Sequence, residues 1–362
     1  MNYALNLPIN TVSFGQVSVA LLREIYKKEH QPCLFPIGNL EINAQKEDKD
    51  FFSWIESCIN KATYLHDKTT PIFKLWHFNG SLSAYSKKQL LLSFYELDQP
   101  TREEINIIKN NDKVLFSCNQ PVETFKSLGI DNVGMVPLGF DSENFKKKDK
   151  TYFSDGRVTF NLTGKFEKRK HHEKVIKSWI KKYGNNPKYF LQCAIWNPFL
   201  KPEDNEKVVQ VLTEGKKYFN VNFLGFMPTN DVYNDFLNSA DIILGMSGGE
   251  GWGLPEFQSV ALGKHAVILN ASGYTSWANE DNSVLVEPSG KIEAYDNMFF
   301  NKGQPWNQGN IHDFNEDVFL DACEKAIERF RDNKENEKGL ELQKEFTYEK
   351  TWNLIESELE KL

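Results

Sequence analysis

The sequence predicts an α/β protein built from two doubly wound domains, in which helices cover both faces of a parallel sheet. The chain has 362 residues, which is too long for one hydrophobic core and sufficient for two. Short apolar runs alternate with amphipathic helical patterns from end to end, as in repeated strand–helix–strand units. A polar, lysine-rich stretch interrupts this alternation once, and the pattern then restarts. We therefore expect a first domain over residues 1–141, a linker over 142–156, a second domain over 157–340 and a closing helical segment over 341–362.

The first half contains six short apolar runs that predict strands. They are residues 3–7, 33–37, 72–76, 90–94, 113–117 and 132–137. Between these runs, apolar residues recur with the spacing of a helix that buries one face. The helical segments are residues 17–28, 51–61, 102–109 and 121–128. This alternation predicts a parallel sheet with helices on both sides.

The second half repeats the arrangement. Its predicted strands are residues 158–163, 189–194, 221–224, 241–246, 266–269 and 283–286. Its predicted helices are residues 171–183, 205–217, 230–237 and 255–262, followed by two longer ones at 316–332 and 348–362. In two-lobed proteins of this kind, ligands bind in the cleft between the carboxyl edges of the two sheets.

Composition and charge argue against several classes of function. The formal net charge is −7, so the chain as a whole does not attract nucleic acid or an anionic membrane. The first residues show no secretion signal, and no apolar run is long enough for a transmembrane helix. The cysteines are scattered without the spacing of a metal site, which predicts reduced thiols in a core. We therefore expect a cytoplasmic protein without a metal site. The cysteines are Cys33, Cys58, Cys118, Cys193 and Cys323.

The most informative segment is a glycine-rich turn at residues 248–256, with the sequence Gly-Gly-Glu-Gly-Trp-Gly-Leu-Pro-Glu. Pro255 suits the first turn of a helix, where its missing N–H costs nothing. The free N–H groups of that turn and the positive end of the helix dipole predict an anionic ligand such as a diphosphate. Glu250 would repel a phosphate, so we expect it to accept hydrogen bonds from hydroxyl groups. A nucleotide sugar carries both groups; the alternative is that the glycines serve only the tight packing of a strand–helix turn.

A basic segment, Gly-Lys-Phe-Glu-Lys-Arg-Lys, occupies residues 164–170 directly after the first predicted strand of the second half. Lys165 and Lys170 at this edge can reach the cleft. There they would balance the charge of a nucleotide diphosphate and stabilise it as a leaving group. The alternative is an ordinary solvated turn.

Several segments, in this order along the chain, resemble the retaining glycosyltransferases of the GT-B fold, in particular the large group around glycosyltransferase family 4. Residues 164–170 resemble the basic pair of that group, G-R-x4-K, with Lys165 at the arginine position. Residues 247–255 resemble its signature S-x2-E-G-F-G-L-P. The resemblance extends over residues 90–290 and is specific as a combination. Its other segments are residues 102–145, 223–226, 239–241, 261–263 and 270–273.

The resemblance implies roles for individual residues. Glu250 would contact hydroxyls of the transferred sugar, and Lys165 and Lys170 would balance the diphosphate. Gly15 would lie in a loop, residues 13–16, that faces the diphosphate and the acceptor; a plain turn before a helix is the alternative. The closing helix would pack back against the N-terminal domain. The implied donor-binding residues are Gly15, Gly164, Gly225, Phe226, Gly251, Trp252, Gly253, Leu254 and Gln258.

Two of these positions depart from the family pattern. Gln258 stands where the family motif has a second glutamate that binds the ribose, and an amide can still exchange hydrogen bonds with ribose hydroxyls. Trp252 replaces another aromatic residue, and we expect it to pack beneath the loop.

Many relatives have a histidine of the N-terminal domain beside the donor sugar. His77, which follows a predicted strand, is our catalytic candidate for this place. Glu96 and Asp98, which follow the next strand, are further cleft candidates. The alternatives are a hydrogen-bonded loop histidine and a helix start before residue 102.

The expected function is that of a hexosyl-type glycosyltransferase. It would move a sugar from a nucleotide diphosphate to a saccharide, lipid-linked or other hydroxyl acceptor, with retention of configuration and without a cofactor or metal ion. The sequence predicts no transmembrane segment and is compatible with peripheral contact with a membrane. The alternatives are a DNA-base or other specialised-acceptor glycosyltransferase, a nucleotide-sugar epimerase, and a non-catalytic subunit that binds a nucleotide sugar.

Overall fold

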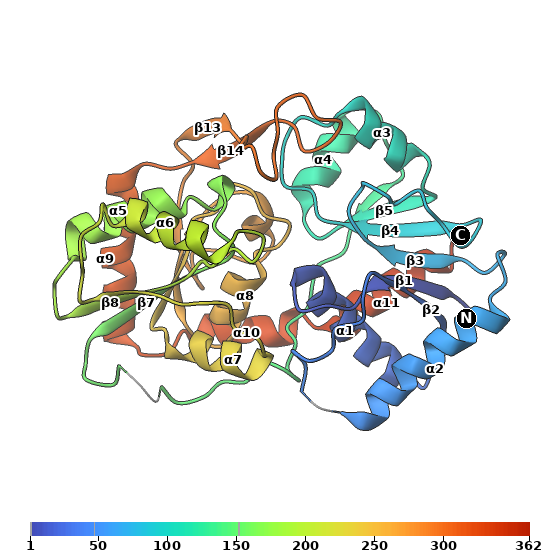
Figure 1. The fold of residues 1–362 in the computed structure, drawn as a ribbon, viewed down its shortest axis with the longest axis horizontal. Coiled ribbons are helices and arrows are strands. Elements are labelled where there is room, and N and C mark those ends of the chain that lie inside the picture. Colours follow the sequence, from blue (N-terminus) through green and yellow to red (C-terminus); the bar gives the residue numbers. More distant parts are fainter. Residues whose placement is uncertain (1, 47, 151–152) are drawn as a thin grey trace.

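The computed structural model describes residues 2–46, 48–150 and 153–362, so residues 151 and 152 of the expected linker lie outside the described residues. Two six-stranded sheets lie side by side, each with helices packed against it (Figure 1). The first sheet takes its strands from the N-terminal part of the chain, and the second takes them from residues after the expected linker. The predicted fold class, two doubly wound α/β domains, is confirmed.

The N-terminal sheet has the strand order β2-β1-β3-β4-β5-β6, and all neighbouring strands are parallel. Its strands β1 and β4 are buried at every position, as expected where helices cover both faces. The strands are β1 (Ala4–Pro8), β2 (Cys33–Ile37), β3 (Ile72–Leu75), β4 (Gln89–Ser93), β5 (Lys113–Phe116) and β6 (Val133–Met135). The helices of this domain are α1 (Ser13–Lys27), α2 (Lys49–Leu65), α3 (Arg102–Lys109) and α4 (Asn119–Ser127).

The C-terminal sheet has the order β12-β11-β10-β7-β8-β9 and is also parallel throughout. Its strands are β7 (Val158–Thr163), β8 (Tyr189–Ala194), β9 (Val221–Phe223), β10 (Ile242–Gly245), β11 (His265–Leu269) and β12 (Val284–Val286). Its helices are α5 (His172–Tyr183), α6 (Pro202–Leu212), α7 (Asn230–Ser239), α8 (Leu254–Ala261) and α9 (Glu316–Asp332), with short 3-10 turns at Lys168–Lys170 and Ser272–Ser276. The predicted strands of both halves are present, with ends that shift by a few residues.

Helix α1 corrects one prediction. It begins at Ser13 rather than at residue 17, so residues 13–16 form its first turn and not a loop. A glycine disfavours a helix interior, which is why the sequence pattern pointed to a later start. Gly15 is required here by packing, because a Cβ atom at this position would lie 2.1 Å from the carbonyl oxygen of Asn10.

A hairpin that the sequence pattern did not reveal joins the two domains. Strands β13 (Gly290–Glu293) and β14 (Asn310–Asp313) pair in antiparallel fashion. Every residue of β13 is exposed, so the strand lacks the apolar alternation that would have predicted it. The hairpin and its loop, residues 290–313, reach across from the C-terminal domain to α3 (Figure 1, orange). We call this segment the bridging hairpin.

The end of the chain returns to the N-terminal domain. Helix α10 (Glu337–Glu345) packs on α8, and α11 (Tyr348–Leu359) packs on α1 (Figure 1, red). Trp352 of α11 is fully buried, and its ring lies 5.2 Å from that of Tyr3 and 6.0 Å from that of Phe73. The expected crossing of the last helix is confirmed. No helix in the part of the chain that the structure describes is long and apolar enough to cross a membrane.

Candidate functional site

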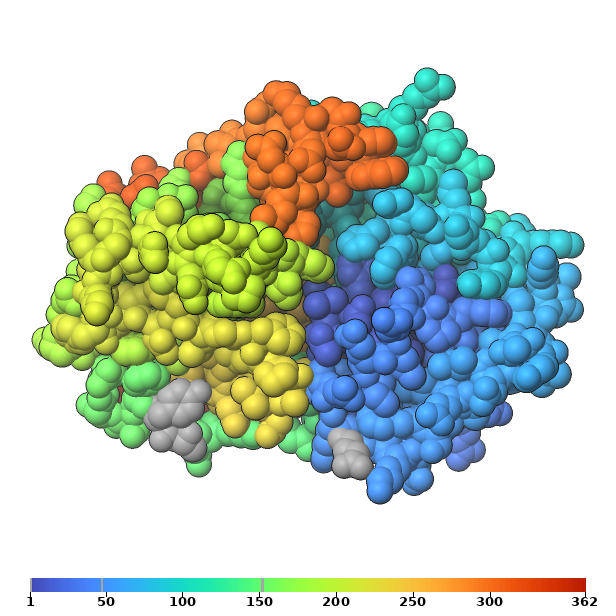
Figure 2. All heavy atoms as spheres, viewed as in Figure 1, coloured from blue at the N-terminus to red at the C-terminus, as the bar shows by residue number. Residues whose placement is uncertain are grey.

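A cavity of about 290 Å³ lies between the carboxyl edges of the two sheets. Both domains line it, and in Figure 2 the bridging hairpin lies across the seam where they meet. We call it the donor cavity, after the sugar donor that the sequence analysis predicts there. Most of the predicted site residues line it, namely Glu96, Gly164, Lys165, Lys170, Gly225, Phe226, Glu250, Gly251, Trp252, Gly253, Leu254 and Gln258.

The glycine-rich turn has the predicted form of strand, turn and helix. Strand β10 ends at Gly245, and α8 begins at Leu254 with Pro255 in its first turn. Trp252 is buried beneath the turn, with its ring 5.4 Å from that of Phe257. Gly251 lies against the other domain, because a Cβ atom there would be 2.8 Å from Cβ of Phe94. This glycine therefore permits close approach of the two domains beside the cavity.

Replacing Gly251 with alanine is expected to lower the free energy of unfolding by about 1–3 kcal/mol, because the added methyl group must displace the backbone that carries Phe94. Urea denaturation measures this change. Gly225→Ala is the matched control, since the Cβ position at Gly225 has no atom within 4 Å. Equal stability of the two variants would show that the domains separate freely at this point, against the prediction.

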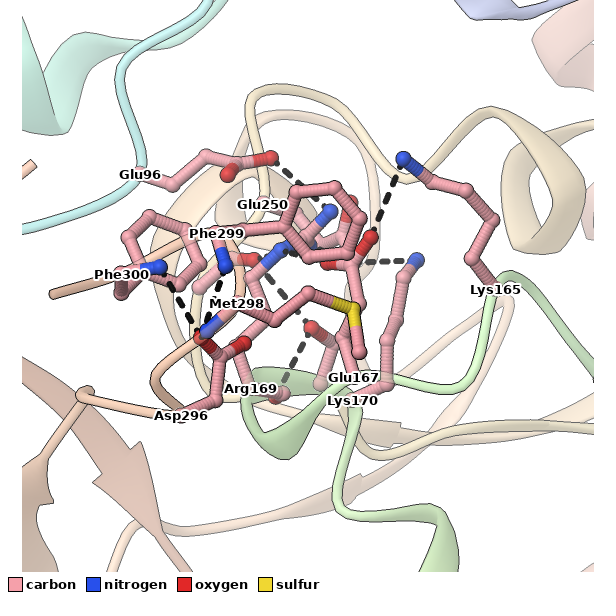
Figure 3. A network of polar contacts seen from close by, with 12 residues as sticks. Glu96, Lys165, Glu167, Arg169, Lys170, Glu250, Asp296, Met298, Phe299 and Phe300 are labelled. Atoms are coloured by element: carbon pink, nitrogen blue, oxygen red, sulfur yellow. Dashed lines mark hydrogen bonds and ion pairs between the residues drawn. The ribbon is translucent and has the colours of Figure 1, made fainter. Parts of the chain in front are cut away.

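Glu250 is the centre of a buried charge network (Figure 3). Its Oε1 atom accepts hydrogen bonds from Nη1 of Arg169 at 2.8 Å and from Nζ of Lys170 at 2.5 Å. Burial alone would raise the pKa of Glu250, but the charges of Lys170 and Arg169 outweigh it and lower the pKa to about 2. The carboxylate is therefore ionised at neutral pH, with two buried cations fixed beside it.

Arg169 is a residue that the sequence analysis missed. Its guanidinium group donates to the carbonyl oxygen of Gly249 at 2.7 Å as well as to Glu250, and its Nε atom lies 2.8 Å from Oε2 of Glu167. A 3-10 turn over Lys168–Lys170 buries Arg169 and Lys170 while Lys168 stays exposed. In the sequence Arg169 is one of several charges in a basic run, and the motif G-R-x4-K assigns positions to Lys165 and Lys170 but not to Arg169.

Glu96 brings a carboxylate from the N-terminal domain to the same network. Its Oε1 atom lies 3.2 Å from Nη2 of Arg169, so this ion pair joins the two domains (Figure 3). Burial raises the pKa of Glu96 to about 7; Arg169 opposes this rise, and the charges of Glu250 and Glu167 add to it. The site therefore contains one carboxylate that is firmly ionised and another that titrates near neutral pH.

Lys165 lines the donor cavity but is bound differently from Lys170. Its Nζ atom pairs with Oε1 of Glu167 at 3.0 Å. It also lies 5.0 Å from the ring centre of Phe199 and 4.9 Å from that of Phe299, a residue of the bridging hairpin. About a third of the Lys165 side chain is exposed, so its charge remains open to the cavity.

Three predicted site residues lie outside the donor cavity. Gly15 is packed inside the first turn of α1. Asp98 binds the bridging hairpin, with its carboxylate 2.8 Å from Nζ of Lys291 and 2.8 Å from the backbone nitrogen of Asn310. His77 is exposed, and its ring lies 4.4 Å from that of Phe14. Strand order placed Asp98 and His77 at the correct sheet edge but could not show which neighbours they meet.

Neither a protein-family model nor a curated protein sequence matches the chain. Solved structures match it over its whole length. Sucrose-phosphate synthase from Thermosynechococcus elongatus superposes with a TM-score of 0.71 at 12% identity, covering 100% of this chain and 98% of the other. Anabaena HepE, in complex with UDP and glucose, gives 0.70 at 12% identity with 100% of both chains covered. WaaG, a glycosyltransferase involved in lipopolysaccharide biosynthesis, gives 0.62 at 9% identity with 99% of both covered.

The chain has the GT-B fold. The match includes both sheets and the returning C-terminal segment, because it covers the whole of this chain. In this GT-B fold the donor cavity lies between the two domains, and the network around Glu250 forms part of its wall.

Proposed function

We propose that the chain is a hexosyl-type glycosyltransferase of the family 4 type, which moves a sugar from a nucleotide diphosphate to an acceptor hydroxyl with retention of configuration. The observation that carries the proposal is the buried, ionised Glu250 in the glycine-rich turn before α8, held by Arg169 and Lys170 in a cavity between the two domains. The similarity in fold to HepE, whose structure contains UDP and glucose, supports a nucleotide-sugar donor.

In the proposed reaction, the anomeric C–O bond of the donor breaks, and negative charge develops on the leaving diphosphate. Lys165, Lys170 and the N–H groups at the start of α8 receive that charge, so the proposal requires no metal ion. Glu250 binds hydroxyls of the sugar. The acceptor oxygen forms the new bond on the same face of the sugar, and its proton passes to the leaving phosphate oxygen. Closure of the two domains on the bound donor would exclude water that would otherwise hydrolyse it.

Gln258 fits the donor-binding part of the proposal. It lies on α8, is buried and lines the donor cavity, where its amide can bind the ribose hydroxyls. Five buried free cysteines fit the reducing interior of a cell, which supports the proposed cytoplasmic location. The net charge of −7 weighs against a DNA acceptor.

A nucleotide-sugar epimerase is the second candidate, and Glu96 favours it. Such an enzyme needs an acid or base beside the sugar, and Glu96 is a cavity carboxyl with a pKa raised to about 7 by burial.

Proton NMR of the protein with single UDP-, GDP- and ADP-sugars, without an acceptor, tests the proposal. We expect slow hydrolysis of one donor, release of the retained anomer first, and loss of hydrolysis in Glu250→Ala. Conversion of the donor to an epimer without hydrolysis would favour the second candidate. Binding of a nucleotide without turnover, even when acceptors are added, would indicate a non-catalytic subunit. Failure of every nucleotide sugar to bind would overturn the proposal.

The pH dependence of donor turnover is expected to follow Glu96. As pH rises through about 7, Glu96 ionises and gains its ion pair with Arg169 across the cleft, so kcat/KM should rise. Arg169, Lys170, Glu167 and Glu250 are the charged groups that influence it. Glu250 is already ionised and contributes no inflection in this range.

Glu96→Gln keeps the size of the side chain and removes its titration, so its pH profile should be flat between about pH 6 and 8. The matched control is Glu173→Gln on the exposed face of α5, which should retain the wild-type profile. An unchanged inflection in Glu96→Gln would assign the titration to another group.

A further inference from the structure

We propose that a second cavity, beneath the bridging hairpin, binds the acceptor and that the acceptor is a saccharide. The cavity has a volume of about 240 Å³ and lies beside the donor cavity. The inference rests on the proposed function, because an acceptor has meaning only for a transferase. It adds the chemical class of the acceptor and the place where it binds.

Both domains build this second cavity. The ends of β3 and β4 supply one side, and the loop of the bridging hairpin supplies the other. The residues that matter for recognition are Trp76, His77, Asn79, Phe94, Phe299 and Trp306.

The loop of the hairpin is held firmly enough to serve as a wall. The hydroxyl of Thr101 donates to the carbonyl oxygen of Pro305 at 2.5 Å. The backbone nitrogen of Asn307 donates to Oε1 of Glu104 at 2.8 Å. These bonds hold the backbone on either side of Trp306 against the N-terminal domain, at Thr101 and at Glu104 of α3.

The lining of the cavity matches the chemistry of a sugar ring. A pyranose has C–H groups on its faces and hydroxyl groups around its edge. The electron-rich faces of Trp76 and Trp306 attract such C–H groups. The exposed amide of Asn79 can donate to one hydroxyl and accept from another.

The charge of the cavity favours a neutral ligand. Its carboxylate, Glu104, is buried and already accepts hydrogen bonds from the backbone nitrogens of Thr101 and Asn307. Among the described residues, no lysine or arginine lines the cavity to pair with a phosphorylated or carboxylated ligand. A long lipid chain would leave the polar groups of the lining without partners.

The second cavity adjoins the donor cavity at two residues. Phe94 lines both cavities. Phe299 lines the second cavity, and its ring faces the Nζ atom of Lys165, which lines the first (Figure 3). A saccharide held beside Trp306 would therefore lie next to the donor cavity. Trp76 also lines a further cavity of about 480 Å³.

Saturation-transfer NMR, performed without a donor, tests the inference. The probes are methyl β-glucoside, N-acetylglucosamine, maltose and cellobiose. At least one probe is expected to bind the wild-type protein. Trp306→Ala removes one ring face, and Asn79→Trp fills the cavity from an exposed loop position, so each should weaken binding about tenfold. Tyr64→Ala, which removes an exposed aromatic residue of α2, is the matched control and should bind as the wild type does.

Donor hydrolysis by the same variants separates this inference from the proposed function. We expect hydrolysis within twofold of wild type in Trp306→Ala and Asn79→Trp, together with about a tenfold loss of transfer to the bound saccharide. Binding of no probe by the wild type, or equal binding by all variants, would overturn the acceptor site while leaving donor turnover intact. Absence of donor turnover in a protein that binds a saccharide would instead count against the proposed function.

Discussion

Replacing Glu250 with glutamine is expected to lower kcat for sugar transfer by about a hundredfold to a thousandfold, the cost of losing one oriented group in comparable polar active sites. The carboxylate has two tasks in the proposed reaction: it binds the sugar hydroxyls, and it holds the cations Arg169 and Lys170. Glutamine keeps the shape of the side chain and removes the charge. Nucleotide binding, measured by calorimetry, should change much less than kcat. A comparable loss of affinity with kcat unchanged would show that Glu250 acts only in binding the donor, against the prediction.

The same substitution is expected to destabilise the protein by about 3–5 kcal/mol at neutral pH, because two buried cations lose their common partner. The pKa of Glu250 is lowered in the folded protein, so its stabilising effect is present above the ordinary glutamate pKa. That effect is lost as pH falls toward about 2. The stability difference between wild type and Glu250→Gln should therefore shrink below about pH 4. Glu173→Gln, at an exposed position of α5, is the matched control.

Replacing Arg169 with methionine is expected to reduce stability by about 3–5 kcal/mol, because buried carboxylates would lose a shared cation. Arg169 acts through other residues, as a positioning residue. Its removal should also change the pH profile of turnover: Arg169 lowers the pKa of Glu96, so the inflection near pH 7 should move to higher pH in the variant.

Arg157→Lys is the matched control for Arg169, since Arg157 pairs with the exposed Asp155 outside the cavity. It should leave both stability and the pH profile unchanged. Arg169→Lys keeps the charge but loses the planar fork that reaches several acceptors, so it should recover only part of the stability. If Arg169→Met loses stability without moving the inflection, Arg169 is structural and Glu96 titrates independently of it.

The parts of the site that depend on neighbouring residues in sequence could be predicted from the sequence. The turn around Glu250 has local causes, a proline in the first turn of α8 and glycines before it, and the structure has the expected form. Lys170 could be assigned to the cleft because it follows a strand of a parallel sheet. The two doubly wound domains followed in the same way from local alternation of strands and helices.

The partners of these residues could not be predicted, because they depend on how distant segments pack. Arg169 and Glu250 are 81 positions apart, and their ion pair exists only after β7 and β10 are side by side. The bridging hairpin was missed because its strands are short and every residue of β13 is exposed. Its absence from the prediction also hid the role of Asp98, whose carboxylate binds that hairpin rather than a ligand.

The return of α11 to the N-terminal domain has a consequence for the order in which the chain folds during synthesis. Trp352 fills a place between Tyr3 and Phe73, so the first domain to be translated receives part of its core from almost the last residues made. A ribosome must complete nearly the whole chain before the apolar face of α1 is covered. Nascent chains that stop before residue 348 should therefore bind chaperones that recognise exposed apolar surface, even though the residues of both sheets have already been translated.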